Sequence, residues 1–91
     1  MQNAATTVNK DLIKDIVQSN LLLGLDGALE RITIQICELY NVPPYMLTNT
    51  ECAEIVKFLD SHRLFLLRDS VNTVARILPT TRVSIYKYMR I

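Results

Sequence analysis

Glycine is scarce in this sequence, with two residues among 91, and proline occurs three times. Tight turns between strands depend on glycine, because glycine readily adopts the left-handed backbone conformations that those turns require. A sheet protein with many such turns is therefore disfavoured. Hydrophobic residues make up 49% of the chain, which is enough for a buried core, and their spacing is mostly that of helices. We predict an all-α protein in which residues 1–91 form a single domain of about five helices.

Histidine and cysteine are also rare, which argues against several kinds of site. His62 is the single histidine, so a metal-binding histidine pair is not available, and no glycine-rich phosphate loop occurs. Cys37 and Cys52 belong to no CxxC motif. We expect both to be buried or half-buried thiols in a reducing cytosol, and a disulfide between them would require their two helices to pack closely. We therefore expect no enzyme activity, no metal and no cofactor.

No long apolar run and no large net charge are present. The longest apolar cluster is LLLGL at residues 21–25, well short of the roughly 18 to 20 residues that span a bilayer. We expect a soluble, cytoplasmic protein with no membrane partner. The net charge is +1, but residues 1–56 contain three basic and seven acidic side chains, whereas residues 57–91 contain seven basic and two acidic ones. Such a basic half is typical of a chain with one face that meets a polyanion.

The apolar spacing in the first half of the chain predicts two helices. The first runs from residue 8 to Gly24 and follows a polar segment, residues 1–7, that we expect to be flexible. Asp26 is predicted to cap a second helix over about residues 27–40. Apolar residues surround much of this second helix, so we expect it to be a central element. Val42 precedes two prolines, which prevent the helix from continuing.

A third helix is predicted to begin near Asn49 or Thr50. Thr48 and Glu51 have the spacing of a capping box, in which each side chain bonds the backbone N–H of the other. We expect one continuous helix through residues 50–68, although the polar stretch at residues 60–62 leaves a break into two helices as an alternative. Ser70 is then predicted to cap the next helix.

The run VARILPTTRVSIYKYMR, residues 74–90, completes two short predicted helices joined by a turn, over about residues 70–90. It resembles the helix-turn-helix of bacterial transcription regulators and recombinases, in which the second helix enters the major groove of DNA. By that resemblance Ala75 is the small residue at the helix crossing. The family usually has glycine in the turn, where this chain has Pro79. The turn must therefore differ in geometry, or the register is off by one. The residues that would pack the two helices together are Val74, Leu78, Ile85 and Tyr88.

The resemblance and the helix geometry together predict a set of DNA contacts. If Ile85 and Tyr88 face inward, the other side of the helix presents basic residues and Tyr86. Thr81 would cap this helix and aim its backbone N–H groups at a phosphate. The alternative is an ordinary solvated helix whose cations suit its dipole. The predicted DNA-binding residues of the turn and second helix are Thr80, Thr81, Arg82, Val83, Tyr86, Lys87 and Arg90.

A looser resemblance extends from Ile32 to the end of the sequence. The segments ICELYNVPPYML, SHRLFLLRD, SVNTVARIL and TTRVSIYKYMRI resemble the C-terminal DNA-binding domain of the bacterial replication initiator, itself similar to the Trp repressor. That layout implies that Arg63 and Arg68 approach the DNA backbone. The Asp-His-Thr-Thr signature of the initiator is absent apart from Thr80 and Thr81, so recognition of the initiator's DNA box is not implied.

We therefore predict sequence-specific binding of double-stranded DNA, by a small transcriptional regulator or an accessory replication factor. One motif of this size binds DNA weakly, so we expect a homodimer that gains a second half-site. The expected dimer seam is the first helix or the leucine cluster at residues 64–67. The alternative function is a protein-binding adaptor or inhibitor that keeps a helix-turn-helix scaffold without binding DNA. An adaptor would show an exposed apolar patch instead of a continuous basic face.

Overall fold

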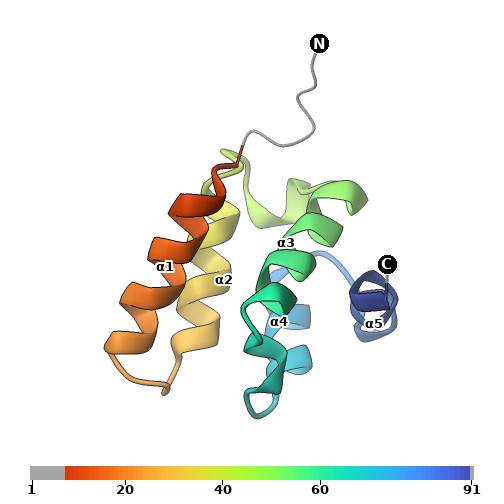
Figure 1. The fold of residues 1–91 in the computed structure, drawn as a ribbon. Helices are drawn as coiled ribbons and strands as arrows, with labels where there is room; N and C mark the ends of the chain where they lie inside the picture. Colours follow the sequence, from red (N-terminus) through yellow and green to blue (C-terminus); the bar gives the residue numbers. More distant parts are fainter. Residues whose placement is uncertain (1–7, 91) are drawn as a thin grey trace.

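A computed structural model describes residues 8–90, and these form five α-helices and two short 3₁₀ segments (Figure 1). No strand occurs within residues 8–90, so the predicted all-α class with about five helices is confirmed. None of the described helices combines the length and apolarity that crossing a membrane would need. The prediction of a flexible segment over residues 1–7 lies outside the described residues. The elements are α1 (Lys10–Leu22), α2 (Ala28–Glu38), η1 (Pro44–Met46), α3 (Asn49–Ser61), η2 (Leu64–Leu66), α4 (Ser70–Ile77) and α5 (Arg82–Arg90).

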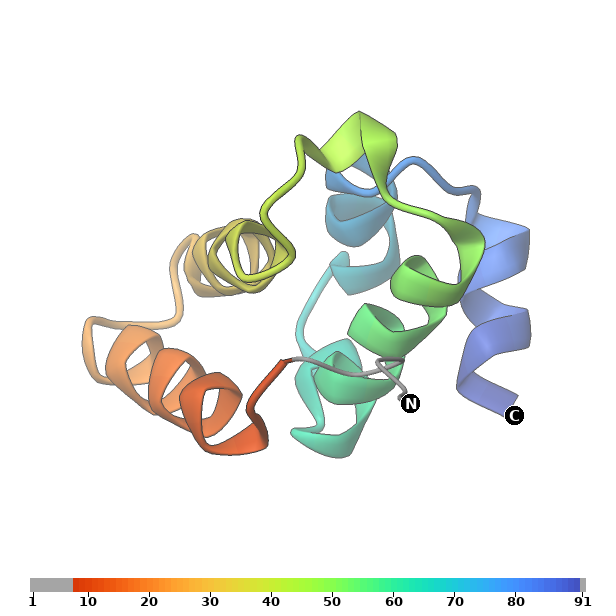
Figure 2. The same cartoon turned by 90° about the horizontal axis from the view of Figure 1, so that it is seen from above.

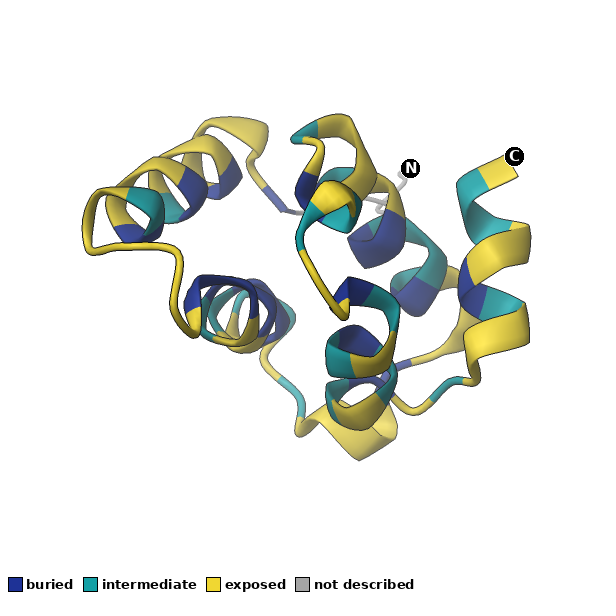
Figure 3. Cartoon of the chain, turned by 90° about the horizontal axis from the view of Figure 1, so that it is seen from below, coloured by how far each residue is buried: buried dark blue, intermediate teal, exposed yellow. Residues whose placement is uncertain are grey.

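Helix α2 lies at the centre of the fold, as predicted, and contacts α1, α3 and α4. Seen from above, α1 and α2 form a helical hairpin beside the group made by α3, α4 and α5 (Figure 2). Ile32 and Ile36 of α2 are fully buried, and the buried parts of the other helices face inward toward one another (Figure 3). Helix α5 contacts α3 and α4 and lies at the far side of the molecule from α1.

A buried polar network fixes α1 against α2. Asn20 is buried at the end of α1, where its Nδ2 donates to Gln35 Oε1 at 3.0 Å and its Oδ1 accepts from Arg31 Nε at 2.9 Å. The Arg31 guanidinium also donates to the backbone carbonyls of Asp26 and Gly24, which belong to the turn between the two helices. Because both ends of the buried amide have partners, the network sets the register of the hairpin without leaving an unsatisfied polar group.

Two predicted helix caps are wrong. Asp26 does not cap α2, because Gly27 occupies the N-cap position with a φ of 74°, and no side chain caps the helix. Ser70 does not cap α4 either, because Asp69 occupies that position with a φ of 58° and makes no capping bond. Ser70 is the first residue of α4, and its buried hydroxyl donates to the carbonyl of Phe65 at 2.9 Å. This bond ties the start of α4 to η2.

The third helix begins as predicted but ends early. The capping box is present, with Glu51 N donating to Thr48 Oγ1 at 3.1 Å and Thr48 N donating to Glu51 Oε1 at 2.9 Å. The continuous helix expected over residues 50–68 is wrong, because α3 ends at Ser61. Arg63 then adopts the left-handed conformation with a φ of 61°. This reversal redirects the chain and lets Leu64 enter the core, which a straight helix would not permit.

Both cysteines are buried, free thiols, as predicted. Cys37 lies on α2 and Cys52 on α3, and these helices contact each other. Burial raises the pKa of the Cys37 thiol to about 11, and the nearby Cys52 and Glu38 act in the same direction. Burial also raises the pKa of Cys52. At neutral pH both thiols therefore stay protonated and serve as core packing groups.

The raised pKa of Cys37 predicts that stability falls in alkaline solution. Above the ordinary thiol pKa of 9.0 the unfolded chain loses this proton, whereas the folded chain keeps it until about pH 11. The contribution of the protonated Cys37 thiol to the free energy of unfolding is therefore fully present below pH 9, and it is lost as the pH rises from 9 to about 11. Urea unfolding should give a lower free energy of unfolding at pH 10 than at pH 8. The drop should be smaller in Cys37→Ala, and an equal drop in both proteins would contradict the raised pKa.

Candidate nucleic-acid interface

Helices α4 and α5 form the two-helix unit predicted for residues 70–90. Val74 and Ile85 are both 0% exposed, and Leu78 of the turn is 2% exposed, so all three pack in the core. Tyr88 and Ala75 are half-buried against this core. The predicted packing residues of the motif are therefore confirmed. They leave one side of α5 facing solvent.

The turn between the helices contains no left-handed residue. None of residues 78–81 has a positive φ, and Leu78 is extended, with φ −84° and ψ 147°. Thr80 N donates to the Leu78 carbonyl at 2.7 Å, which closes a tight bend around Pro79. The sequence left two alternatives, a turn geometry different from the glycine form or a register shifted by one residue. The structure shows the different turn geometry, and the motif keeps its predicted register. A proline, whose φ is fixed near −65°, suits a turn of this kind.

Thr81 caps the start of α5, as predicted. Its Oγ1 accepts from Ser84 N at 3.1 Å and donates to the Ser84 hydroxyl at 3.2 Å. The Thr81 carbonyl accepts the first helical bond, from Ile85 N at 3.0 Å. The cap satisfies one of the backbone N–H groups at this end of the helix, and the others point away from α5 with the positive end of its dipole. An anion such as a phosphate is favoured at that end.

The solvent side of α5 is basic. Ile85 is its one buried residue among the described ones, and residues 82–90 contain three cations and no acid. Val83 is 69% exposed and Tyr86 is 43% exposed. Thr80 is half-buried just before the helix. The other predicted contacts on this side are exposed as well: Thr81, Arg82, Lys87 and Arg90.

A shallow hollow between α4 and α5 adds residues that the sequence alone did not single out. Arg82 and Tyr86 line it from α5, and Asp69 and Asn72 line it from the start of α4. Asn72 Nδ2 donates to Asp69 Oδ1 at 2.7 Å, which fixes the orientation of the amide. The three-residue spacing of Asp69 and Asn72 at a helix start is the sequence signal that could have identified the pair.

Arg63 and Arg68 lie outside this hollow. Arg63 stands in the turn after α3 instead of on a long helix, and its side chain is exposed. Arg68 lines a different hollow, between α2 and α4, together with Arg76. The structure thus brings the predicted residues of α5 together and separates Arg68 from them. Among residues 8–90, no group of three or more metal-ligating side chains occurs.

Comparison with known proteins identifies one family. The sequence model of a family described as "HTH domain" matches residues 28–90, which include α2 to α5. No curated protein and no solved structure matches the chain, and the looser resemblance to the replication initiator gains no support from these comparisons. The matched region extends well beyond the two-helix motif. Together with the exposed basic side of α5, the match supports nucleic-acid binding, with DNA as the partner.

The cap at Thr81 predicts a selective loss of order in α5. Thr81→Ala removes the hydroxyl that Ser84 N bonds, and such a change costs about 1 kcal/mol of stability. Amide hydrogen exchange should accelerate in the first turn of α5. Thr81→Ser should restore protection, because serine caps equally well. Thr80→Ala is the matched control, and equal effects at the two positions would show that the cap does not order α5.

Proposed function

The chain belongs to the helix-turn-helix domain family, and from this we propose that it binds double-stranded DNA through α5 as a small, sequence-specific transcriptional regulator. The main observation that supports this function is that α5 has one buried side and one exposed, basic side. Ile85 anchors one side in the core, and the other side exposes only cations among its charged groups. An accessory replication role has less support, since it depends on the looser resemblance alone.

The dimensions of α5 suit the major groove of DNA. A helix with its side chains is about 10–12 Å across, and the major groove is about 12 Å wide. In the proposed complex Arg82 reads a guanine edge through two hydrogen bonds, because its planar guanidinium matches O6 and N7. Lys87 and Arg90 contact phosphates. Tyr86 packs on a thymine methyl group or donates to a phosphate.

The start of α5 supplies the next contacts in this proposal. Thr80 and Thr81 stand where the positive end of the helix dipole favours a phosphate. Val83 is exposed beside them and contacts the DNA by apolar packing. Arg63 contacts the backbone from the turn after α3. These contacts leave α1 away from the DNA, since α1 and α5 lie at opposite sides of the fold (Figures 1 and 2).

A homodimer completes the proposal. One α5 reaches a few base pairs, and a second copy on the same duplex raises the overall affinity without any new kind of contact. A dimer also accounts for apolar surface elsewhere. Exposed leucines, which an adaptor could use for protein contact, occur outside α5 at Leu22, Leu23 and Leu66. Because α5 itself carries three cations and no acid, DNA contact is assigned to α5, which favours a DNA-binding protein over an adaptor that binds no DNA.

Fluorescence anisotropy on duplex DNA at several salt concentrations tests DNA binding. Wild type should bind with a dissociation constant that rises steeply with salt, because binding releases counterions from the phosphates. Arg82→Ala plus Lys87→Ala removes a guanine-reading side chain and a phosphate-binding one. The double variant should bind more weakly, by about 1–3 kcal/mol from the Arg82 change alone, and its affinity should depend less steeply on salt.

The control for this experiment is Lys10→Ala plus Lys14→Ala, which removes the same number of exposed cations from α1. Because α1 lies away from the proposed DNA face, this variant should bind like wild type. The proposal fails if wild type shows no salt-dependent binding, or if the two double variants behave alike.

A further inference from the structure

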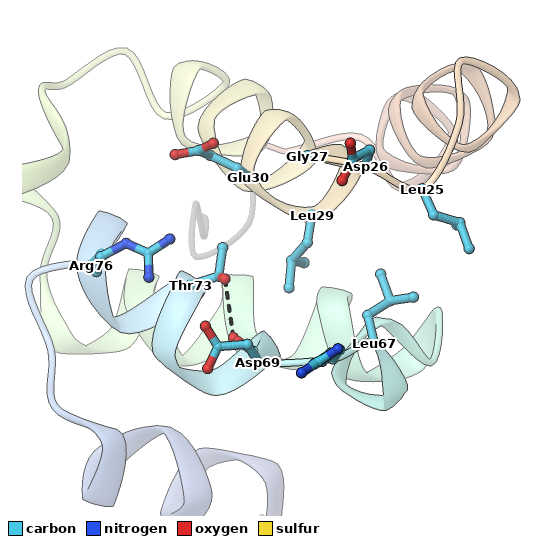
Figure 4. A pocket seen from close by; sticks show the side chains of 10 residues that line it. Leu25, Asp26, Gly27, Leu29, Glu30, Leu67, Asp69, Thr73 and Arg76 are labelled. Atoms are coloured by element: carbon cyan, nitrogen blue, oxygen red, sulfur yellow. Dashed lines mark hydrogen bonds between the residues drawn. The ribbon is translucent and has the colours of Figure 1, made fainter.

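A second hollow lies between the hairpin of α1 and α2 and the segment that leads from η2 into α4 (Figure 4). Leu25, Asp26, Gly27, Leu29 and Glu30 form one wall, at the α1–α2 turn and the start of α2. The facing wall is formed by Leu67, Arg68, Asp69, Thr73 and Arg76. Leu29 and Leu67 project toward the space from opposite walls (Figure 4). The hollow contains no residue of α5.

Leu25 and Leu67 line this hollow from its two walls, and exposed leucines lie near each of them in the sequence. Leu22 and Leu23 are 88% and 76% exposed at the end of α1, and Leu25 in the adjoining turn is 64% exposed. Leu66 is 81% exposed beside Leu67. Isolated exposed leucines are common, but leucines from two chain segments around one hollow form the kind of apolar surface that proteins use for contact. Leu25, in the turn that follows the first helix, and Leu67, at the end of the 64–67 cluster, thus line the same hollow from its two walls.

The two walls of the hollow carry opposite charges. Asp26 and Glu30 stand on the α2 wall, and Arg68 and Arg76 stand on the α4 wall. Within residues 8–90, the charged groups of these four side chains form no hydrogen bond and no ion pair. Asp69, the one acid on the basic wall, already accepts from Asn72. The charges are therefore available to a partner whose surface has the complementary arrangement.

We propose that this hollow is the seam of a homodimer, in which the α1–α2 turn of each copy enters the hollow of the other. A twofold axis brings the acidic wall of each copy against the basic wall of its partner, so the same contact forms twice. A second copy of this chain therefore has the charge pattern that the hollow requires. Leu25 and Leu67, which line the hollow, become buried at the centre of the interface, and the ion pairs fix its register.

This inference depends on the proposed function only for the reason why a dimer is useful, because the seam itself involves no DNA. Arg68, expected from the sequence on the DNA backbone, takes part in the dimer contact instead. The seam leaves the exposed side of α5 accessible in both copies, since α5 contributes nothing to the hollow. Each copy can then present one α5 to its own half-site.

Exchanging the charges of the two walls tests the seam without DNA. Sedimentation equilibrium of the full chain should show a wild-type dimer. Asp26→Lys plus Glu30→Lys makes both walls basic, and Arg68→Glu plus Arg76→Glu makes both walls acidic. Each double variant alone should dimerise about a hundredfold more weakly, because like charges then face each other at both contacts. An equal mixture of the two double variants should restore the dimer, because both contacts are again of opposite charge.

The control variant is Asp11→Lys plus Asp15→Lys, which makes the same change in net charge on the exposed side of α1 and should leave the dimer intact. Leu25→Glu should abolish the dimer. The helical circular-dichroism spectrum should not change, because Leu25 is already exposed in the isolated chain. A wild type that stays monomeric at several hundred micromolar protein, charge variants that dimerise like wild type, or a mixture that stays monomeric would each overturn the proposal. Anisotropy of the same variants on a DNA half-site reports DNA binding separately, so failure of the seam and failure of DNA binding are distinguishable.

Discussion

The arrangement of the proposed DNA-binding face depends on the burial of one side chain, Ile85. Helix α5 is short and has no other fully buried residue within the described chain, so Ile85 sets the rotation of the helix about its own axis. The half-buried Tyr88 and Met89 support that rotation, and the Thr81 cap defines where the helix begins. With Ile85 directed into the core, helical geometry places Val83, Lys87 and Arg90 on the opposite side, in solvent. An apolar contact thereby determines which polar groups are available to DNA.

The core that receives Ile85 is organised around α2. This helix contacts three others, and its isoleucines Ile32 and Ile36 are fully buried. The hairpin of α1 and α2 is closed by the Arg31 guanidinium, which donates to the carbonyls on both sides of the exposed Leu25 in the turn. The family match begins at residue 28, so α1 lies outside the matched region and α2 begins it. The helix-turn-helix domain and the proposed dimer seam thus share α2 and α4 while using different sides of them.

Two hollows share Asp69 in their lining, and each lies beside the surface assigned to a different proposed partner. One hollow lies between α4 and α5 and is lined by Arg82 and Tyr86 of α5 and by Asp69, whose carboxylate accepts from Asn72. The other lies between α2 and α4 and combines charges of both signs with exposed leucines. The exposed side of α5, with cations and no acid, suits a polyanion, whereas a surface with both signs and apolar groups suits a protein. This difference in chemistry is the basis for assigning DNA to α5 and a second copy of the chain to the α2–α4 hollow.

Much of this protein follows from local sequence. Helix periodicity, the Thr48–Glu51 capping box, the Thr81 cap and the inward positions Val74, Leu78 and Ile85 all depend on neighbours a few residues apart, and each was predictable. The left-handed residues Arg63 and Asp69 were not, because non-glycine residues adopt that conformation only where packing compensates its cost. Those two residues end α3 early and turn the chain into α4. Tertiary packing therefore determines the positions of Arg68 and of the leucines of η2. These positions follow from the chain reversal at Arg63 and the burial of Leu64, and no local sequence pattern predicts them.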